Sequence, residues 1–434
     1  MTVQKSSSVA LPPVRLRTNA LVDPLGLDDL EPEFSWQFVE GGSGVAQTAY
    51  RLQVTAGDDF VAGLVWDSGR VEADVPFGVR YAGEPLRSGT RYVWRVGVAD
   101  QAGELGPWSE PASFETGVLD PSRWQASWIS GPAPATHNDD AALYLRGALE
   151  LPAAVVRGRA YASALGWYRL FVNGADLTGP ALVPRWTSLD EVVEYQTYDV
   201  TDAFRAGGNV VGIAVGDGRY RGRLGFRDVR RVYGGRLAGF LQLELELADG
   251  STVTWTTDRS WAAGPGRILG SDPKHGERVD LRVPDEDWLT GPTAPLRFGP
   301  AELLPPHPRR LIAEEVPQVG EVQRLAPVRV WRSPSGKQLV DFGQNAAGVV
   351  RVRLIGPAGT TVRVTHSEVL TGDGELDTAY LAEGRDAGWC QRDEVTLDGG
   401  QSWWQPWFTI HGFRFCEVDG LDGDLAAEDV EYVV

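Results

Sequence analysis

Apolar and polar residues alternate with a period of two along much of the chain. In residues 241–247 every odd position is Leu, whereas the even positions hold Gln or Glu. Only a β-strand with one buried face places side chains in this way. Asp249-Gly250 follows, and the alternation resumes at Val253 and Trp255. This pattern predicts a β-hairpin whose tight turn contains a residue with positive φ.

The same alternation recurs in other parts of the chain. Residues 349–355 and 362–365 show it on either side of Pro357-Ala358-Gly359, and residues 92–98 place Tyr, Trp, Val and Val on one face. Helical periodicity is confined to single turns at 201–206 and 284–289. We therefore predict an all-β protein built from antiparallel β-sandwiches.

Two loop-like stretches divide the chain into three predicted domains. Residues 119–134 have the Pro and Gly content of a loop, and residues 299–327 contain prolines at a density that a sheet ladder does not tolerate. The predicted tandem sandwiches span residues 1–120, 127–300 and 310–434. The first has the size and strand pattern of a fibronectin type III domain, which it resembles. The second is interpreted as a jelly-roll-like sandwich of the carbohydrate-binding type.

The charge balance and the termini narrow the classes of partner. The 434 residues include 41 Lys and Arg against 59 Asp and Glu, a net charge of −18. Nucleic acids and anionic membranes both require clustered positive charge, so neither is an expected partner. No apolar run approaches the ~20 residues of a membrane span, and the N-terminus lacks the apolar core of a secretion signal. With only two cysteines, we expect a reducing compartment and a cytoplasmic location.

The common signatures of catalytic and cofactor sites are absent from the sequence. It has no P-loop, no dinucleotide-binding glycine turn, no Gly-x-Ser-x-Gly elbow and no His or Cys pair at zinc spacing. His366 and His411 lie in alternating strands, and we interpret both as structural hydrogen-bonding residues. Cys390 and Cys416 are expected to be buried thiols. No cofactor is predicted to be required.

Arginines are concentrated in residues 219–236. Seven of them occur there with a single carboxylate, Asp228, in an otherwise acidic protein. Guanidinium groups suit planar anions, so Arg227, Arg230 and Arg231 could contact an acidic sugar or a neighbouring acidic domain. The alternative is a hairpin whose arginines pair with nearby Asp and Glu.

Two turns in the second predicted domain have the chemistry of a calcium site or a sugar site. Residues 173–176 (Asn-Gly-Ala-Asp) offer carboxylate and amide oxygens of the kind that Ca²⁺ prefers, which makes Asn173 and Asp176 candidate ligands. Residues 216–218 (Gly-Asp-Gly) form a similar turn. Trp186 is a candidate platform for a sugar ring. Each of these features also occurs in ordinary hairpins and cores.

Several longer motifs in the second and third domains resemble the bacterial α-L-rhamnosidases, a family of glycoside hydrolases. The second domain carries three of them, at residues 166–174, 195–201 and 216–225. The third domain is similar to the concanavalin-like domain of the family. Its motifs are Asp341-Phe342-Gly343-Gln344-Asn345, Gly356-Pro357-Ala358-Gly359-Thr360, His366-Ser367-Glu368-Val369-Leu370 and Pro406-Trp407-Phe408-Thr409-Ile410-His411-Gly412-Phe413-Arg414.

The sequence also departs from the family pattern. Ser188-Leu189-Asp190-Glu191 stands where a polar, basic stretch is usual, and Arg219 stands where an aromatic residue is commoner. An acidic segment of the family survives as Asp272, Gly276-Glu277 and Asp280-Leu281-Arg282, without its tyrosines. Combining the turns with the resemblance, we predict a carbohydrate-binding site in the second domain. Its members are Trp186, Asp217, Arg219, Arg221, Arg223, Asp272 and Glu277.

The resemblance implies that catalysis takes place elsewhere. In the family the active site lies in a helical (α/α)6 domain that follows the concanavalin-like domain, and no such repeat occurs in this sequence. No catalytic residue is therefore predicted, and we expect the chain alone to be inactive on rhamnosides. We interpret it as the non-catalytic β-domain portion of a rhamnosidase, either truncated, split between genes or complete. Its expected partners are a rhamnose-containing glycan and a helical catalytic domain, in cis or in trans.

Two other interpretations remain open. The chain could be a free-standing carbohydrate-binding or scaffolding protein derived from such an enzyme. It could also be a self-sufficient hydrolase that uses two carboxylates of its third domain at the separation that glycoside hydrolysis requires.

Overall fold

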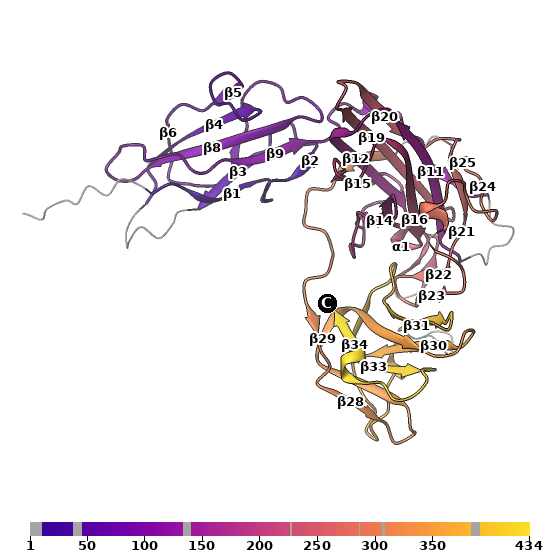
Figure 1. Cartoon of the computed structure of the whole chain (residues 1–434). Coiled ribbons are helices and arrows are strands. Elements are labelled where there is room, and N and C mark those ends of the chain that lie inside the picture. The colour runs from indigo at the N-terminus through magenta and orange to yellow at the C-terminus, as the bar shows by residue number, and fades with distance from the viewer. Residues whose placement is uncertain are drawn as a thin grey trace, which may run out of the picture. The chain divides into compact units, whose positions relative to one another are not determined.

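The computed structural model describes residues 11–37, 46–132, 140–225, 228–285, 287–305, 309–382 and 391–434. Strands account for nearly all of the regular structure, as Figure 1 shows. The chain divides into two compact units. The smaller contains residues 1–125 and 312–317, and the larger contains residues 126–311 and 318–434.

The smaller unit is a β-sandwich, as predicted. One sheet has the order β2-β9-β8-β4-β5 with β6 on β4, and the other has the order β1-β3-β7. Its strands are β1 (Val14–Thr18), β2 (Leu25–Leu27), β3 (Glu33–Gln37), β4 (Ala49–Ala56), β5 (Leu64–Asp67), β6 (Val71–Glu72), β7 (Val79–Arg80), β8 (Arg91–Ala99) and β9 (Ala112–Thr116). The alternating aromatics of β8 face inward, and Trp94 packs on Phe34 with ring centroids 4.6 Å apart.

The larger unit begins with a second sandwich. Its seven-stranded sheet has the order β25-β10-β19-β12-β15-β26 with β20 on β19, and its six-stranded sheet has the order β14-β13-β16-β11-β21-β24. The first sheet consists of β10 (Ile129–Ser130), β12 (Val155–Leu165), β15 (Val192–Asp199), β19 (Ala238–Leu247), β20 (Thr252–Thr256), β25 (Glu302–Leu303) and β26 (Arg310–Ala313). The second consists of β11 (Leu143–Leu151), β13 (Trp167–Val172), β14 (Ala175–Asp176), β16 (Gly207–Gly216), β21 (Ala262–Pro265) and β24 (Gly299–Pro300).

The hairpin predicted from the leucine alternation is confirmed. β19 pairs with β20 in a register that places Leu243 opposite Trp255 and Leu245 opposite Val253, and the odd-numbered leucines are buried. Gly250 has the expected positive φ of 84°. Gln242 is buried as well, because β19 lies in the middle of the sheet and is covered on both faces over part of its length.

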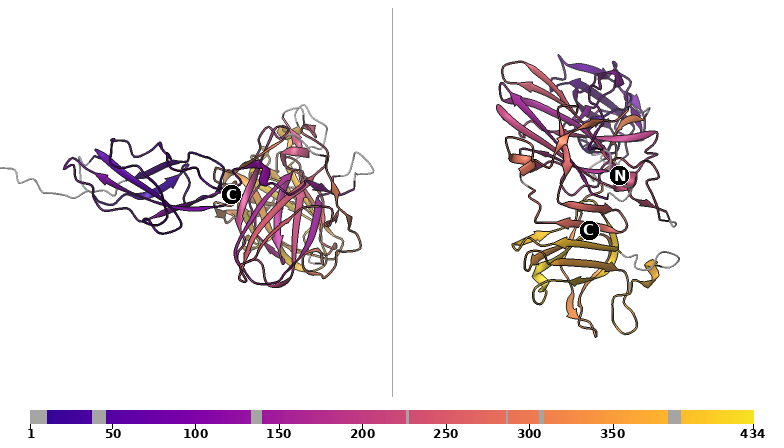
Figure 2. Two further views of the ribbon diagram at one scale, coloured as in Figure 1. Left: turned by 90° about the horizontal axis from the view of Figure 1, so that it is seen from above. Right: turned by 90° about the vertical axis from the view of Figure 1, so that its right-hand side faces the viewer.

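A ten-stranded sheet completes the larger unit and extends across two predicted domains. Its order is β22-β23-β31-β30-β33-β29-β34-β27, with β28 and β32 on β29. β22 and β23 come from the second predicted domain, yet β23 pairs in parallel with β31 of the third. Figure 1 and the right-hand view of Figure 2 both show β22 and β23 beside the yellow strands. The strands are β22 (Ile268–Asp272), β23 (Gly276–Asp280), β27 (Arg324–Leu325), β28 (Arg329–Arg332), β29 (Gln338–Ile355), β30 (Thr361–Ser367), β31 (Gln391–Thr396), β32 (Gln401–Trp404), β33 (His411–Asp419) and β34 (Val430–Val433).

The hydrophobic core also continues across this junction. One cluster of buried residues includes Tyr144, Trp167 and Trp288 of the second predicted domain together with Phe408 and Tyr432 of the third. A Cβ added at Gly216 would lie 2.4 Å from the Phe408 ring, so the glycine allows the two segments to approach. The predicted boundary near residue 300 therefore separates segments of the chain that share one core.

Helices are short throughout the described ranges. α1 (Gly218–Arg221) and α2 (Asp287–Thr290) are single turns, and η1 (Pro121–Arg123), η2 (Ala379–Ala382) and η3 (Ala427–Asp429) are 3₁₀ turns. α2 overlaps the predicted turn at 284–289, and residues 201–203 form a hydrogen-bonded turn and not a helix, which agrees with the expectation of a single turn at most. There, Thr201 bonds to Asp199 through its N–H and its hydroxyl, which replaces a helical hydrogen-bond pattern. No described helix is long and apolar enough to cross a membrane.

Candidate functional site: a charged cluster, an aromatic platform and a buried histidine pair

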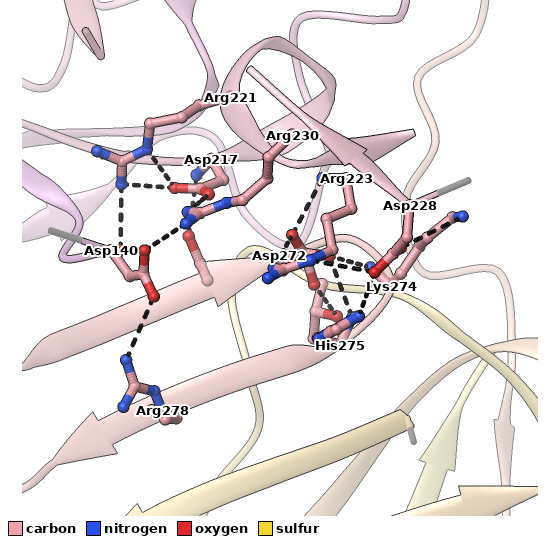
Figure 3. Close-up of polar contacts among 12 residues, drawn as sticks. Asp140, Asp217, Arg221, Arg223, Asp228, Arg230, Asp272, Lys274, His275 and Arg278 are labelled. Atoms are coloured by element: carbon pink, nitrogen blue, oxygen red, sulfur yellow. Dashed lines mark hydrogen bonds and ion pairs between the residues drawn. The ribbon is translucent and has the colours of Figure 1, made fainter. Parts of the chain in front are cut away.

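Asp217 is the centre of a buried ion-pair cluster at the end of β16 (Figure 3). Its side chain has no exposed surface, and its two oxygens accept hydrogen bonds from Arg221 Nε at 2.7 Å and from Arg230 Nη2 at 2.6 Å. Arg230 also bonds to Asp140, and Arg221 donates to the Ala141 carbonyl at 2.8 Å. α1 brings Asp217 and Arg221 together because they stand four residues apart on one helical turn.

The charge state of this cluster follows from its contacts. Desolvation raises the pKa of Asp217, and Arg221 and Arg230 oppose that rise. Burial alone would lower the pKa of Arg230, but Asp217 and Asp140 raise it overall. Because both oxygens of Asp217 accept guanidinium hydrogen bonds, the geometry fits the ionised carboxylate. Asp217 and Arg221 therefore stabilise the fold, and neither presents a free charge to a ligand.

Asp272 organises a second group of charges beside the first. One oxygen accepts the Arg223 N–H at 3.0 Å, and the other accepts the Lys274 and His275 N–H groups at 2.9 and 3.1 Å. His275 Nε2 lies 3.0 Å from Asp228 Oδ2. Burial, helped by nearby Arg223, lowers the pKa of His275. The hydrogen bonds of the Asp272 side chain to Lys274 and His275 hold the turn between β22 and β23 in place.

A polar pocket lies next to these two groups. Its volume is about 330 Å³, and its lining includes Asp140, Arg223, Arg230, His275 and Arg392. Arg223 and Arg230 both pair with carboxylates of this chain. The arrangement agrees with the interpretation in which the arginines pair with nearby Asp. Arg227 lies outside the described residues.

Trp186 and Arg219 form an aromatic platform on the surface of the second domain. The Trp186 side chain is 55% exposed, and its Nε1–H donates to the Tyr233 hydroxyl at 3.1 Å. The Arg219 guanidinium lies over the rings of Trp186 and Trp167, at 5.4 and 5.7 Å from their centroids. Burial lowers the pKa of Arg219, although Asp272 opposes this. Of the predicted sugar-binding residues, Trp186 is the one with a largely exposed aromatic face.

Glu277 lies in the interior, away from solvent. Its carboxylate accepts the backbone N–H groups of Trp407 at 3.1 Å and Phe408 at 2.9 Å, and only 1% of the residue is exposed. Burial raises the pKa of Glu277 to about 8, Asp393 adds to the rise, and the Phe408 and Trp407 N–H groups oppose it. Glu277 joins β23 to the segment before β33, and a ligand in solvent cannot reach it in this arrangement.

The predicted calcium ligands are committed to other contacts. Asn173 has a φ of 51°, its amide N–H donates to the Ala203 carbonyl and to Asn209, and its oxygen accepts the Val210 N–H. One oxygen of Asp176 accepts two backbone N–H groups, and the other accepts Arg169 Nη1 at 2.7 Å. A calcium ion requires oxygens that are free to coordinate it. The donor set at this turn therefore does not fit the ion.

A buried group of two histidines and one aspartate was not predicted from the sequence. His366 of β30, Asp393 of β31 and His411 of β33 are 0%, 1% and 1% exposed, and one ligand atom from each lies within 4.8 Å of the other two. Both histidines make hydrogen bonds, as expected, with His366 Nδ1 to the Gln391 carbonyl and His411 Nε2 to Asp393. The alternation of the strands could have pointed to this group. Asp393 lies two residues from Val395, and His366 two residues from Val364, so each polar residue is on the same strand face as a buried valine.

The cysteine prediction is confirmed for the part that the structure describes. Cys416 is free and fully buried, and its burial raises the pKa of the thiol. Cys390 lies outside the described residues.

Comparison with known proteins assigns the three domains. Residues 13–120 match the Rha78A-like N-terminal immunoglobulin domain. Residues 153–323 match the α-L-rhamnosidase N-terminal domain, and residues 331–434 match the bacterial α-L-rhamnosidase concanavalin-like domain. The immunoglobulin description of the first domain and the predicted fibronectin type III likeness share one sandwich architecture.

Relatives and solved structures agree with these matches. The chain is 28% identical to an α-L-rhamnosidase of Formosa agariphila over 96% of this chain and 47% of that protein, and 29% identical to one of Streptomyces avermitilis over 94% and 55%. The crystal structure of an α-L-rhamnosidase from Aspergillus terreus matches with a TM-score of 0.88 and 31% identity, over 98% of this chain and 49% of that one. The structure of an α-L-rhamnosidase from Dictyoglumus thermophilum matches with a TM-score of 0.89 and 28% identity, over 99% of this chain and 49% of that one.

The fold and these matches define the protein as a set of β-sandwich domains from a glycoside hydrolase family. More particularly, its three domains are the immunoglobulin, N-terminal and concanavalin-like domains of the α-L-rhamnosidases. It spans about half the length of the curated relatives that it matches.

Proposed function

We propose that this chain is the scaffold of an enzyme that hydrolyses terminal α-L-rhamnose from glycosides, and that it holds the helical catalytic domain in place. The relatives are named α-L-rhamnosidases, and the chain matches only about half of each. Within the described ranges, helices are limited to single turns, so the catalytic machinery of the family has no counterpart among them. The β-domains would supply rigid surfaces for docking.

The observation that carries this proposal is an apolar groove beside β34. Its volume is about 210 Å³, and its apolar lining includes Val319, Val322, Trp407, Ile410 and Val433. Val322 is 81% exposed and Val319 is 49% exposed. Clustered exposed apolar side chains of this kind mark interaction surfaces. The resemblance implies a helical domain after the concanavalin-like domain, and we therefore propose this groove, which is lined in part by Val433 of that domain, as its docking surface.

A binding measurement tests the scaffold role. The partner is the part of the Streptomyces avermitilis α-L-rhamnosidase that lies outside the 55% matched by this chain, titrated into this chain by calorimetry. We expect binding, and we expect Val322→Asp to weaken it at least about tenfold, which is about 1.4 kcal/mol. Val322 is so exposed that a charge there should leave folding intact.

Leu296→Asp is the matched control, because Leu296 is fully exposed in the same unit and does not line the groove. Equal weakening by both substitutions, or no binding by the unmodified chain, would count against the proposal. The chain alone should release no p-nitrophenol from p-nitrophenyl α-L-rhamnopyranoside, and clear release would support a self-sufficient hydrolase instead.

Weak carbohydrate binding at the Trp186 platform is a second proposed role. Its support is the exposed indole, held in place by Tyr233 and Arg219. Aromatic faces of this kind stack on sugar rings in ligand sites. Asp217, Arg221, Arg223 and Asp272 would act only by holding the adjoining turns.

Titration with L-rhamnose, followed by the chemical shifts of the tryptophan indole N–H groups, tests this role. We expect the indole N–H resonance of Trp186 to shift on addition of sugar. In Trp186→Ala, the indole N–H resonances of the remaining tryptophans should no longer shift. Trp403→Ala is the control, because Trp403 is a similarly accessible indole on β32. A response that persists in Trp186→Ala would place the sugar elsewhere. A sugar response without binding of the catalytic part would favour a free-standing carbohydrate-binding protein.

We also infer a cytoplasmic location, which the scarcity of cysteines supports. The one described cysteine, Cys416, is a buried free thiol. Such a thiol suits a reducing compartment.

A further inference from the structure

We infer that His366, Asp393 and His411 form a binding site for a divalent transition-metal ion, with Zn²⁺ as the best match. The three residues come from the adjacent strands β31, β30 and β33 of the ten-stranded sheet. This site is independent of the proposed docking groove and of the Trp186 platform. Its role would be structural, because all three side chains are buried.

The distances between the three side chains suit one ion. Asp393 Oδ2 lies 3.3 Å from His411 Nε2 and 3.8 Å from His366 Nε2. Zn–N and Zn–O bonds of about 2.1 Å in a tetrahedron place neighbouring ligand atoms about 3.4 Å apart. One observed separation is close to this value, and the other needs only a small side-chain adjustment.

The hydrogen bonding of the group is incomplete without a cation. Among the described residues, His366 Nε2 and Asp393 Oδ2, two of the proposed ligand atoms, are buried polar atoms without a hydrogen-bond partner. His366 Nδ1 meets the Gln391 carbonyl at 3.2 Å, which requires a proton on Nδ1 and leaves the Nε2 lone pair facing the carboxylate. Two lone pairs that face each other in a dry interior repel, and a bound cation would convert the repulsion into two bonds. His411 Nε2 would bind the ion without its proton, in place of its 3.4 Å hydrogen bond to Asp393 Oδ1.

Two of the three proposed ligands, His366 and Asp393, have the hydrogen-bonded support that metal ligands usually have. A ligating histidine commonly donates its other N–H to a carbonyl or carboxylate, as His366 does to Gln391. Asp393 Oδ1 accepts the Glu277 N–H at 2.8 Å, which fixes the orientation of the carboxylate. Two imidazoles with one carboxylate favour Zn²⁺ and its neighbours over Ca²⁺ and Mg²⁺, which prefer all-oxygen sites.

Metal analysis of the intact chain tests the site. The protein is produced in zinc-supplemented medium, passed through metal-free buffer and analysed by plasma mass spectrometry. We expect about one zinc ion per chain, and loss of most of it in His366→Gln and in His411→Gln. His275→Gln is the matched control, because His275 also contacts an aspartate but lies in the partly exposed cluster of Figure 3. That variant should keep the metal.

A second measurement needs no variant. X-ray absorption at the zinc edge of the unmodified protein should show nitrogen and oxygen ligands at about 2.0–2.1 Å, with a histidine signature. Unmodified protein that is folded without stoichiometric metal, and whose Tm after refolding is the same with and without Zn²⁺, would overturn the inference. Metal retained at the unmodified level in both histidine variants would also overturn it.

Discussion

Replacing Asp217 with Ala is expected to lower the free energy of unfolding of the larger unit by about 3–5 kcal/mol. Asp217 is fully buried and holds Arg221 and Arg230, whose side chains are 5% and 18% exposed. Removing the carboxylate leaves the Arg221 charge buried with only carbonyl partners and weakens the position of Arg230. A buried charge without its counter-ion costs far more than an exposed one, because water cannot solvate it.

Chemical denaturation monitored by circular dichroism measures this effect. Asp424→Ala is the matched control, since Asp424 also pairs with an arginine, Arg332, but is 80% exposed. Exposed ion pairs contribute about 0–1 kcal/mol, so the control should change little. If the two substitutions had similar effects, the buried cluster would not have the stabilising role described here. Asp217→Asn keeps the shape of the side chain and should recover only part of the loss.

Trp288→Ala is expected to cost about 3–5 kcal/mol by leaving a large cavity. Trp288 is completely buried in α2, with its ring centroid 4.9 Å from that of Tyr144 and 5.6 Å from that of Phe171. A Cβ added at Gly212 would approach the Trp288 ring to 2.4 Å, which shows how closely the indole is packed on β16. The surrounding strands are held in their sheets, so they can collapse only partly into the cavity.

The same measurement tests whether the second and third domains unfold together. Because Trp288 belongs to the core that Phe408 and Tyr432 share, a single transition for the larger unit should shift as a whole. Trp403→Ala is the control, since Trp403 is 38% exposed and its ring centroid lies 4.3 Å from the Arg351 guanidinium carbon. We expect a loss of less than about 1 kcal/mol there. Two separate unfolding transitions, of which the substitution shifts only one, would show that the shared core does not couple the second and third domains.

Local patterns predicted the strands well because they depend on neighbours in the sequence. The β19–β20 hairpin was predicted from alternating leucines and from Asp249-Gly250, and the structure has that register. Family motifs located the second and third domains, because each motif covers a whole strand or turn and the motifs occur in the same order as in the family. The sequence predicts no more than a single turn at 201–206, and the structure has a turn there, in which the Asp199 carboxylate accepts the N–H and the hydroxyl of Thr201.

The candidate site was less predictable, because a motif shows which residues occur but not what surrounds them. Glu277 was assigned to a sugar site, yet the structure places it in the interior, where it accepts N–H groups from residues about 130 positions away. Asn173 and Asp176 have the right chemistry for calcium, but their oxygens are used by the turn itself and by Arg169. Exposure alone distinguishes Trp186 from the buried indoles, and exposure is a tertiary property.

The sequence by itself determined the all-β class, the alternation of the main strands and the family of the domains, because these follow from short-range periodicity and from motif order. The parallel pairing of β23 with β31, the pairing of Arg230 with Asp217 and Asp140, and the meeting of His366, Asp393 and His411 were decided only by the tertiary structure. Each of these contacts joins residues that are remote in sequence or on different strands. Their partners are selected by the packing of whole sheets, which no local pattern records.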